Sequence, residues 1–310
     1  MISNISQMDV KSFLSKDGLA IFLFHGVIEK QTYTVRNYMG KHIQTDNFEK
    51  YISILAANGN PMSMNQVLQH LEHGHNFLPG SFAITFDDGF ENNISVAKPI
   101  LEKYKVPAMI YLTTDFIDTG QMSWIDRIEY AVQHTKKRQI KIFQTNRNYS
   151  LNDDDEKIKL LIAVRQFVKN TQGCNPINFS NQVCMDLGFS ENNLLSDDPL
   201  DKKLIWDQVK LINKNDRLIS FGGHSHTHSI LSYLSYEDLC FELDTSLSLL
   251  KYKGGVNPIH YSYPEGLAHC YSKTVMDELK IRGVRCCPTA ISGVNSAKTN
   301  PFELFRIMVA

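Results

Sequence analysis

The stretch Ser81-Phe-Ala-Ile-Thr-Phe-Asp-Asp-Gly89 is an apolar run that ends abruptly on two adjacent carboxylates and a glycine. Such a run is typical of a buried strand, and strand ends of this kind are where α/β enzymes keep their chemistry. Because adjacent residues leaving a strand point in opposite directions, Asp87 and Asp88 are expected to have different roles. Two like charges this close repel each other, and a bound cation would keep both ionised. The stretch therefore predicts a metal site at a strand end of an α/β fold.

Three histidines follow a second apolar run, in the segment Gly222-Gly-His-Ser-His-Thr-His-Ser229. His224 and His228 would share one face if the segment turned helically, whereas His224 and His226 would share one if it stayed extended. The two glycines favour a turn. We therefore expect His224 and His228 to bind the metal together with one oxygen of Asp88, which leaves open positions for water and substrate.

Asp87 is then the free carboxylate of the pair. Since a divalent ion lowers the pKa of bound water to about 7, Asp87 could take a proton from that water as a general base. Zinc is the expected ion, with Co²⁺, Ni²⁺, Fe²⁺ or Mn²⁺ as alternatives. In a second interpretation the histidines form an exposed polar loop and the aspartates cap the following helix. The presence of both motifs at strand ends favours the metal site.

These motifs resemble those of the polysaccharide deacetylases of the NodB-homology type, metal-dependent enzymes that remove N- or O-acetyl groups from sugars. Thr85-Phe-Asp-Asp-Gly89 is similar to the first motif of the family, and His224-Ser-His-Thr-His228 fits its second, His-Ser/Thr-x-x-His. The resemblance implies that the first aspartate is the catalytic base. It also implies that the second aspartate binds the metal with the two outer histidines.

Two further roles follow from the resemblance. Tyr261-Ser-Tyr-Pro-Glu-Gly266 is similar to a family segment in which the backbone N–H after the proline helps to hold the oxyanion, a role that falls to the amide of Glu265. The strand Ala20-Ile-Phe-Leu-Phe-His-Gly26 ends in a histidine. This looks like the permuted members of the family, among them the poly-N-acetylglucosamine deacetylases, and makes His25 the expected general acid. Its alternative role is a strand-end histidine that is hydrogen-bonded to backbone.

Two family features have no counterpart at their usual places. The arginine that orients the catalytic base normally precedes the proline segment, where this chain has Pro258, Ile259 and His260. The usual C-terminal Leu-x-His is absent as well. We expect no arginine at the family position and consider Asp126 or Arg127 as its replacement or as hydrogen-bond partners of the substrate.

Apolar runs alternate with helical stretches along the chain, with expected strands near residues 20, 83, 110, 220, 261, 284 and 306. This order and the resemblance predict a distorted (β/α)7 barrel, in which the strand ends converge on one face. Residues 120–216 break the rhythm and predict a helical insertion or lid over the rim. Trp124 in this insertion could stack on a sugar or pack between helices. We expect residues 1–310 to form a single polysaccharide deacetylase-like catalytic domain.

The composition excludes several classes of protein. A formal net charge of −1 and the lack of a basic stripe argue against a nucleic-acid partner. The six cysteines show no Cys-x-x-Cys spacing and are expected to be reduced, buried thiols. The N-terminus lacks a basic start before an apolar run, and no segment approaches the roughly 20 apolar residues that cross a bilayer. We expect a cytoplasmic protein without a transmembrane segment.

The sequence thus predicts a metal-dependent hydrolase that removes an N-acetyl group from a sugar or polysaccharide intermediate. The alternatives are a deformylase or O-acetyl esterase acting on a sugar, and a carbohydrate-binding pseudoenzyme that keeps the fold without turnover.

Overall fold

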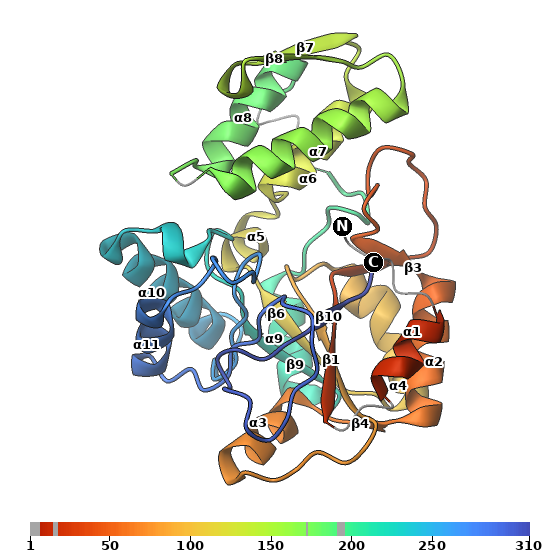
Figure 1. The fold of residues 1–310 in the computed structure, drawn as a ribbon, viewed down its shortest axis with the longest axis vertical. Coiled ribbons are helices and arrows are strands. Elements are labelled where there is room, and N and C mark those ends of the chain that lie inside the picture. Colours follow the sequence, from red (N-terminus) through yellow and green to blue (C-terminus); the bar gives the residue numbers. More distant parts are fainter. Residues whose placement is uncertain (1–6, 15–17, 172, 191–195) are drawn as a thin grey trace.

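A parallel sheet lies at the centre of the computed structural model, which describes residues 7–14, 18–171, 173–190 and 196–310 (Figure 1). Its strand order is β10-β1-β5-β6-β9, and the short strand β4 pairs with β5 at one end. The strands are β1 (Leu19–Phe24), β4 (Asn60–Pro61), β5 (Ser81–Phe86), β6 (Ala108–Leu112), β9 (Ile219–Gly223) and β10 (Ile307–Met308). β1, β5 and β6 are buried along their whole lengths, as expected for parallel strands covered on both faces.

Isolated parallel bridges continue the strand order beyond β9. They join Gly223 to Tyr261, His260 to Cys286, and Pro288 to Leu304. Leu304 lies just before β10, which pairs again with β1, so the parallel pairings return to the strand where they began. The expected strands near residues 261 and 284 therefore take part through single bridges rather than full ladders. Proline contributes to this, since Pro264 and Pro288 have no N–H to donate to a neighbouring strand.

The strand register brings residues distant in sequence to one edge of the sheet. β1 and β5 pair residue by residue from Leu19 with Ser81 to Phe24 with Phe86. His25 and Asp87, which directly follow these strands, therefore leave the sheet side by side, and the Asp87 amide donates a hydrogen bond of 3.0 Å to the Phe24 carbonyl. The carboxyl ends of these strands form the expected common face.

Helices cover both sides of this sheet (Figure 1). One group packs on the core of β1 and β5, and another packs beside β9 and the segment at residues 261–263. The first group contains α1 (Gln7–Leu14), α2 (Thr45–Asn58), α4 (Lys98–Tyr104) and α9 (Trp206–Asn215), and the second contains α10 (Tyr236–Tyr252) and α11 (Lys273–Ile281). Shorter elements are α3 (Met64–His73), α5 (Thr114–Thr119), the 3₁₀ turn Leu231–Tyr233 and a two-stranded sheet of β2 (Gly26–Ile28) and β3 (His42–Gln44). A π-helical turn at Asn93–Ala97 leads into α4.

A second hydrophobic core forms mostly from the range expected to be an insertion, and Val35 from outside that range joins it. We call residues 124–187 the helical module; Figure 1 shows it above the sheet. It contains α6 (Trp124–His134), β7 (Gln139–Ile142), the 3₁₀ turn Phe143–Thr145, β8 (Arg147–Ser150), α7 (Asp154–Asn170) and α8 (Pro176–Leu187). Helix α9 lies in the same expected range, but its Val209 packs in the main core. All six cysteines are free, and in the described part of the chain no helix has the length and apolar character needed to cross a membrane.

Candidate active site

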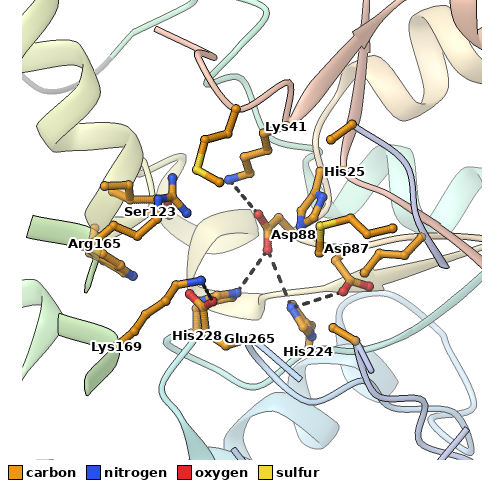
Figure 2. Close-up of a pocket in the computed structure, with 17 residues that line it drawn as sticks. His25, Lys41, Asp87, Asp88, Ser123, Arg165, Lys169, His224, His228 and Glu265 are labelled. Carbon is orange, nitrogen blue, oxygen red and sulfur yellow. Dashed lines mark ion pairs between the residues drawn. The ribbon is translucent and has the colours of Figure 1, made fainter. Parts of the chain in front are cut away.

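A cavity lies at the carboxyl ends of the central strands, between the sheet and the helical module (Figure 2). The sheet side contributes His25, Asp87 and Asp88, and the module contributes Trp124, Arg165 and other residues of α6 and α7. The side chains expected from the two sequence motifs therefore line one cavity.

Asp88, His224 and His228 form a group that can hold a metal ion. One ligand atom of each residue lies within 4.8 Å of the others. Asp88 Oδ1 is 3.3 Å from His228 Nε2 and 3.7 Å from His224 Nε2. The His224 Nδ1 lies 2.9 Å from the Ser262 carbonyl oxygen and is assigned the ring proton that this contact requires. The other nitrogen, Nε2, is then unprotonated and can bind a metal ion. Within the described residues, the buried Asp88 Oδ1 accepts no hydrogen bond of standard geometry. These atoms fit a divalent ion with nitrogen and oxygen ligands.

The two histidines converge through a tight turn, so the expected helical turn is wrong. Residues 224–228 are irregular, with Ser225 at φ 63° and His228 at φ 62°. The Ser225 Oγ accepts a 2.8 Å hydrogen bond from the His228 amide, which closes the turn. His226 lies elsewhere, with its Nδ1 2.9 Å from Thr114 Oγ1. The pairing of His224 with His228 is thus preserved, but by left-handed backbone conformations rather than by helical spacing.

Left-handed backbone is concentrated at this cavity. Seven described residues other than glycine have positive φ, and four of them are Asp88, Ser225, His228 and Glu265. This conformation is unfavourable for residues with a Cβ, and such positions cluster at functional sites. Asp88 at φ 74° turns away from the direction of Asp87, which explains how neighbouring carboxylates reach different partners.

Arg306 holds Asp87 with two parallel hydrogen bonds, each 2.8 Å long. Its Nη2 also donates a 2.9 Å hydrogen bond to Ser262 Oγ, and the whole side chain is buried. Burial raises the pKa of Asp87, but the Arg306 guanidinium and His224 outweigh this effect and lower the pKa below its ordinary value. Asp87 is therefore ionised and fixed in orientation at neutral pH.

The ion pair between Arg306 and Asp87 corrects the expectation that Asp126 or Arg127 replaces the family arginine. An arginine does orient Asp87, but it directly precedes the last strand and is 219 residues away in the sequence. Arg127 is not its replacement, because its guanidinium bonds to the Met122 carbonyl, to Gln121 and to Asn181 of α8. Asp126 also bonds elsewhere, to Lys41.

His25 directly follows β1, and its ring faces the cavity that holds Asp87 and Asp88 (Figure 2). Its carbonyl oxygen accepts a 2.7 Å hydrogen bond from Asn93, which anchors the backbone of the residue. Burial lowers the pKa of the imidazole to about 4, and the nearby Asp88 carboxylate only partly offsets this effect. The ring is therefore neutral at neutral pH, and nearby negative charge favours its protonation.

Glu265 joins the sheet side of the cavity to the helical module. It follows Pro264 with φ 60°, and its carboxylate forms an ion pair with Lys169 of α7. Burial opposes ionisation, but Lys169 and His228 lower the pKa of Glu265 to about 2. Trp124 is 4% exposed and packs in the core of the module, so helix packing is its main role, although it also borders the cavity.

Comparisons with known proteins point to one family. The family model described as "Polysaccharide deacetylase" matches residues 75–286. No match was found among curated proteins.

Several solved structures are similar over nearly the whole chain. One is "Streptococcus pyogenes deacetylase PplD in complex with acetate", with 16% identity, a TM-score of 0.60, and coverage of 94% of this chain and 92% of that chain. Another is IcaB from Ammonifex degensii, with 16% identity, a TM-score of 0.58, and coverage of 96% and 93%. A third is the deacetylase domain of BpsB from Bordetella bronchiseptica, with 15% identity, a TM-score of 0.57, and coverage of 95% and 97%. At these identities the likeness establishes the fold, and it confirms the mixed α/β architecture with a parallel sheet.

Proposed function

We propose that this chain, which belongs to the polysaccharide deacetylase family, is a metal-dependent hydrolase that removes an N-acetyl group from a sugar or polysaccharide intermediate. The main observation behind this proposal is that the two adjacent carboxylates, Asp87 and Asp88, have different partners. Asp87 is held ionised by Arg306, while Asp88 Oδ1 faces two imidazole nitrogens. A binding protein has no need of a second, oriented carboxylate beside a metal site.

Asp88, His224 and His228 would hold the ion, with zinc as the first candidate and Co²⁺, Ni²⁺, Fe²⁺ or Mn²⁺ as alternatives. When bound, a divalent ion supplies a Lewis acid for the acetyl carbonyl and lowers the pKa of water. The donor set is suited to this role because His224 is fixed in orientation through its other ring nitrogen.

We expect alanine substitutions of the three histidines of the turn to differ in their effect on zinc affinity. His224→Ala and His228→Ala each remove one of three ligands and should weaken zinc binding by about tenfold or more. His226→Ala is the matched control, because His226 contacts Thr114 rather than Asp88, and it should bind zinc as the parent protein does. Competition titration with a chromogenic chelator measures the three affinities. A loss in His226→Ala as large as in the other two would move the ligand pair to His224 and His226.

The remaining steps belong to side chains and backbone of this chain. Asp87, ionised and oriented by Arg306, accepts a proton from the attacking water. The backbone amide of Glu265 is the candidate donor to the oxyanion that develops on the acetyl carbonyl. The negative charge of the tetrahedral species raises the pKa of His25 from the low value set by burial, so that the ring takes up a proton from solvent and then donates it to the departing nitrogen. The products are acetate and a free amino sugar.

Release of acetate from N-acetylated sugars tests this function, and His25→Ala tests the acid. An amide cannot expel its nitrogen as an anion, whereas an activated ester loses its oxygen readily. We therefore expect His25→Ala to lower N-acetyl turnover by on the order of 100-fold and to keep a larger share of activity on an activated acetate ester. Both are measured as acetate per unit time with zinc-loaded protein.

Equal losses of His25→Ala on the two substrates would show that the proton comes from another group. Parent protein that releases acetate only from O-acetylated sugars would favour an esterase, and release of formate would favour a deformylase. Protein that binds glycans without any release would be a pseudoenzyme.

We further propose that the helical module, whose Arg165 and Lys169 line the cavity, shapes the substrate cleft.

A further inference from the structure

Lys41 binds the oxygen of Asp88 that the two histidines do not face. Its Nζ lies 2.9 Å from Asp88 Oδ2, whereas His224 and His228 approach Oδ1. Figure 2 shows Lys41 reaching Asp88 from the side opposite to the histidines. The side chain of Lys41 is 18% exposed and that of Asp88 is 4% exposed, so this ion pair lines the cavity and is largely shielded from solvent.

Asp126 fixes the position of Lys41. The Lys41 Nζ lies 3.1 and 3.2 Å from the two Asp126 oxygens, so the ammonium is held between carboxylates from different parts of the fold. The positive charge of Lys41 thus lies between Asp88 and Asp126 of α6.

Lys203 balances the remaining charge on Asp126. Its ammonium is fully buried, lies 3.9 Å from Asp126 Oδ2 and sits 3.3 Å from the centre of the Phe90 ring. The two lysines and the two carboxylates therefore form a buried, neutral group. Such a group is costly to assemble, and it places one ammonium on one oxygen of the carboxylate that faces the histidines.

We propose that Lys41 is a positioning residue that occupies Oδ2 of Asp88, so that only Oδ1 is available to a metal ion. This inference rests on the proposed metal site and goes beyond it, because it assigns a role to a lysine outside both sequence motifs. A carboxylate restricted to one oxygen leaves more positions for water and for the acetyl oxygen. The positive charge of Lys41 also withdraws electron density from Asp88, which makes the carboxylate a weaker ligand.

The proposal predicts that metal affinity and turnover change in opposite directions. Lys41→Met removes a positive charge near the cation and frees Oδ2, so we expect Co²⁺ and Zn²⁺ to bind more tightly, on the order of tenfold. Turnover should fall by about 10- to 100-fold, since the metal loses an open position. The visible absorption of the Co²⁺ form should weaken as a further ligand oxygen is added, because six-coordinate Co²⁺ absorbs less than four- or five-coordinate Co²⁺.

Two further variants complete the experiment. Lys41→Arg keeps the charge and the donors and should restore the parent Co²⁺ spectrum and affinity. Asp126→Asn, which loosens Lys41 without touching Asp88, should shift the spectrum in the direction of Lys41→Met by a smaller amount. Circular dichroism establishes that each variant is folded, and if Lys41→Met does not fold, Asp126→Asn and Lys41→Arg carry the test.

The outcomes separate this inference from the proposed function. Parent protein that binds neither Co²⁺ nor Zn²⁺ overturns both. Parent protein that binds metal, with a Co²⁺ spectrum unchanged in Lys41→Met or Asp126→Asn, overturns the positioning role alone. Weaker metal binding in Lys41→Met also overturns it, since that result would make Lys41 a support for the ligand. Tighter binding with a weakened spectrum and reduced turnover supports the proposal.

Discussion

Asp87→Asn is expected to lower turnover on an N-acetylated sugar by on the order of 100-fold or more, with zinc still bound. Asparagine keeps the shape of the side chain but has no affinity for a proton at neutral pH. The substitution leaves Asp88 and the two histidines in place, and although Asp87 Oδ2 lies 3.8 Å from His224 Nε2, its two oxygens are held by Arg306. Steady-state acetate release and zinc content, measured on the same preparation, test the expectation.

Asp88→Asn is the matched control for that variant, since it makes the same chemical change at the neighbouring residue. It should lower zinc affinity itself, because Asp88 Oδ1 lies 3.3 Å from His228 Nε2 and 3.7 Å from His224 Nε2. If zinc occupancy instead fell most in Asp87→Asn, the roles of base and ligand would be reversed. An Asp87→Asn protein with unchanged turnover would place the base elsewhere.

Some of the residues that meet at the cavity were predicted from the sequence. A strand that ends on polar residues predicts its own position in a parallel sheet, and the carboxyl ends of such strands share one edge. This is why Asp87 and Asp88 could be assigned to a site from a local pattern, whereas His25 was added to that site through the family resemblance. The structure brings them together through the register of β1 and β5. Asp88, His224 and His228 lie together as the metal-site prediction requires, although the turn that brings the histidines together is not helical.

The partners of these residues could not be predicted, because they come from distant parts of the chain. Lys41 directly precedes the short strand β3 and belongs to no motif, and its contact with Asp88 depends on the path of the chain between β2 and β3. Arg306 left a weak signal, since a charged residue among apolar neighbours in an expected strand requires a buried partner. The helical module was predicted as an interruption of the strand rhythm, but its own hydrophobic core became visible only in the structure.

Replacing Arg306 with methionine is expected to have the largest effect on stability. It leaves Asp87 buried without its guanidinium, and removal of one partner from a buried pair costs about 3–5 kcal/mol in the free energy of unfolding. Turnover should also fall by on the order of 100-fold or more, since Asp87 loses both its orientation and its low pKa. Urea unfolding of metal-free protein at pH 7 measures the first effect without the contribution of a bound ion.

The double variant Arg306→Met with Asp87→Asn distinguishes two causes of the instability. One is the uncompensated charge of Asp87, and the other is the lost packing of the Arg306 side chain. The double variant removes the uncompensated charge, so it should recover much of the stability that Arg306→Met loses. Lys273→Met, which breaks the exposed pair with Asp277, should leave unfolding unchanged. A double variant as unstable as Arg306→Met would show that packing, rather than charge, accounts for the loss.

The dependence of this loss on pH gives an independent test, because its sign is fixed by the pKa of Asp87. With Arg306 present, the folded-state pKa lies below the ordinary value, so the pair contributes stability above a pH of about 4 that is lost as the pH falls through the folded-state pKa. Without Arg306, burial raises the pKa of Asp87, and the carboxyl takes up a proton in the folded state at a higher pH. The difference in unfolding free energy between parent and Arg306→Met should therefore shrink as the pH is lowered from 7 towards about 4. A difference that stays constant over this range would mean that the guanidinium does not control the ionisation of Asp87, and the oriented base at the centre of the proposed mechanism would have to be sought in another residue.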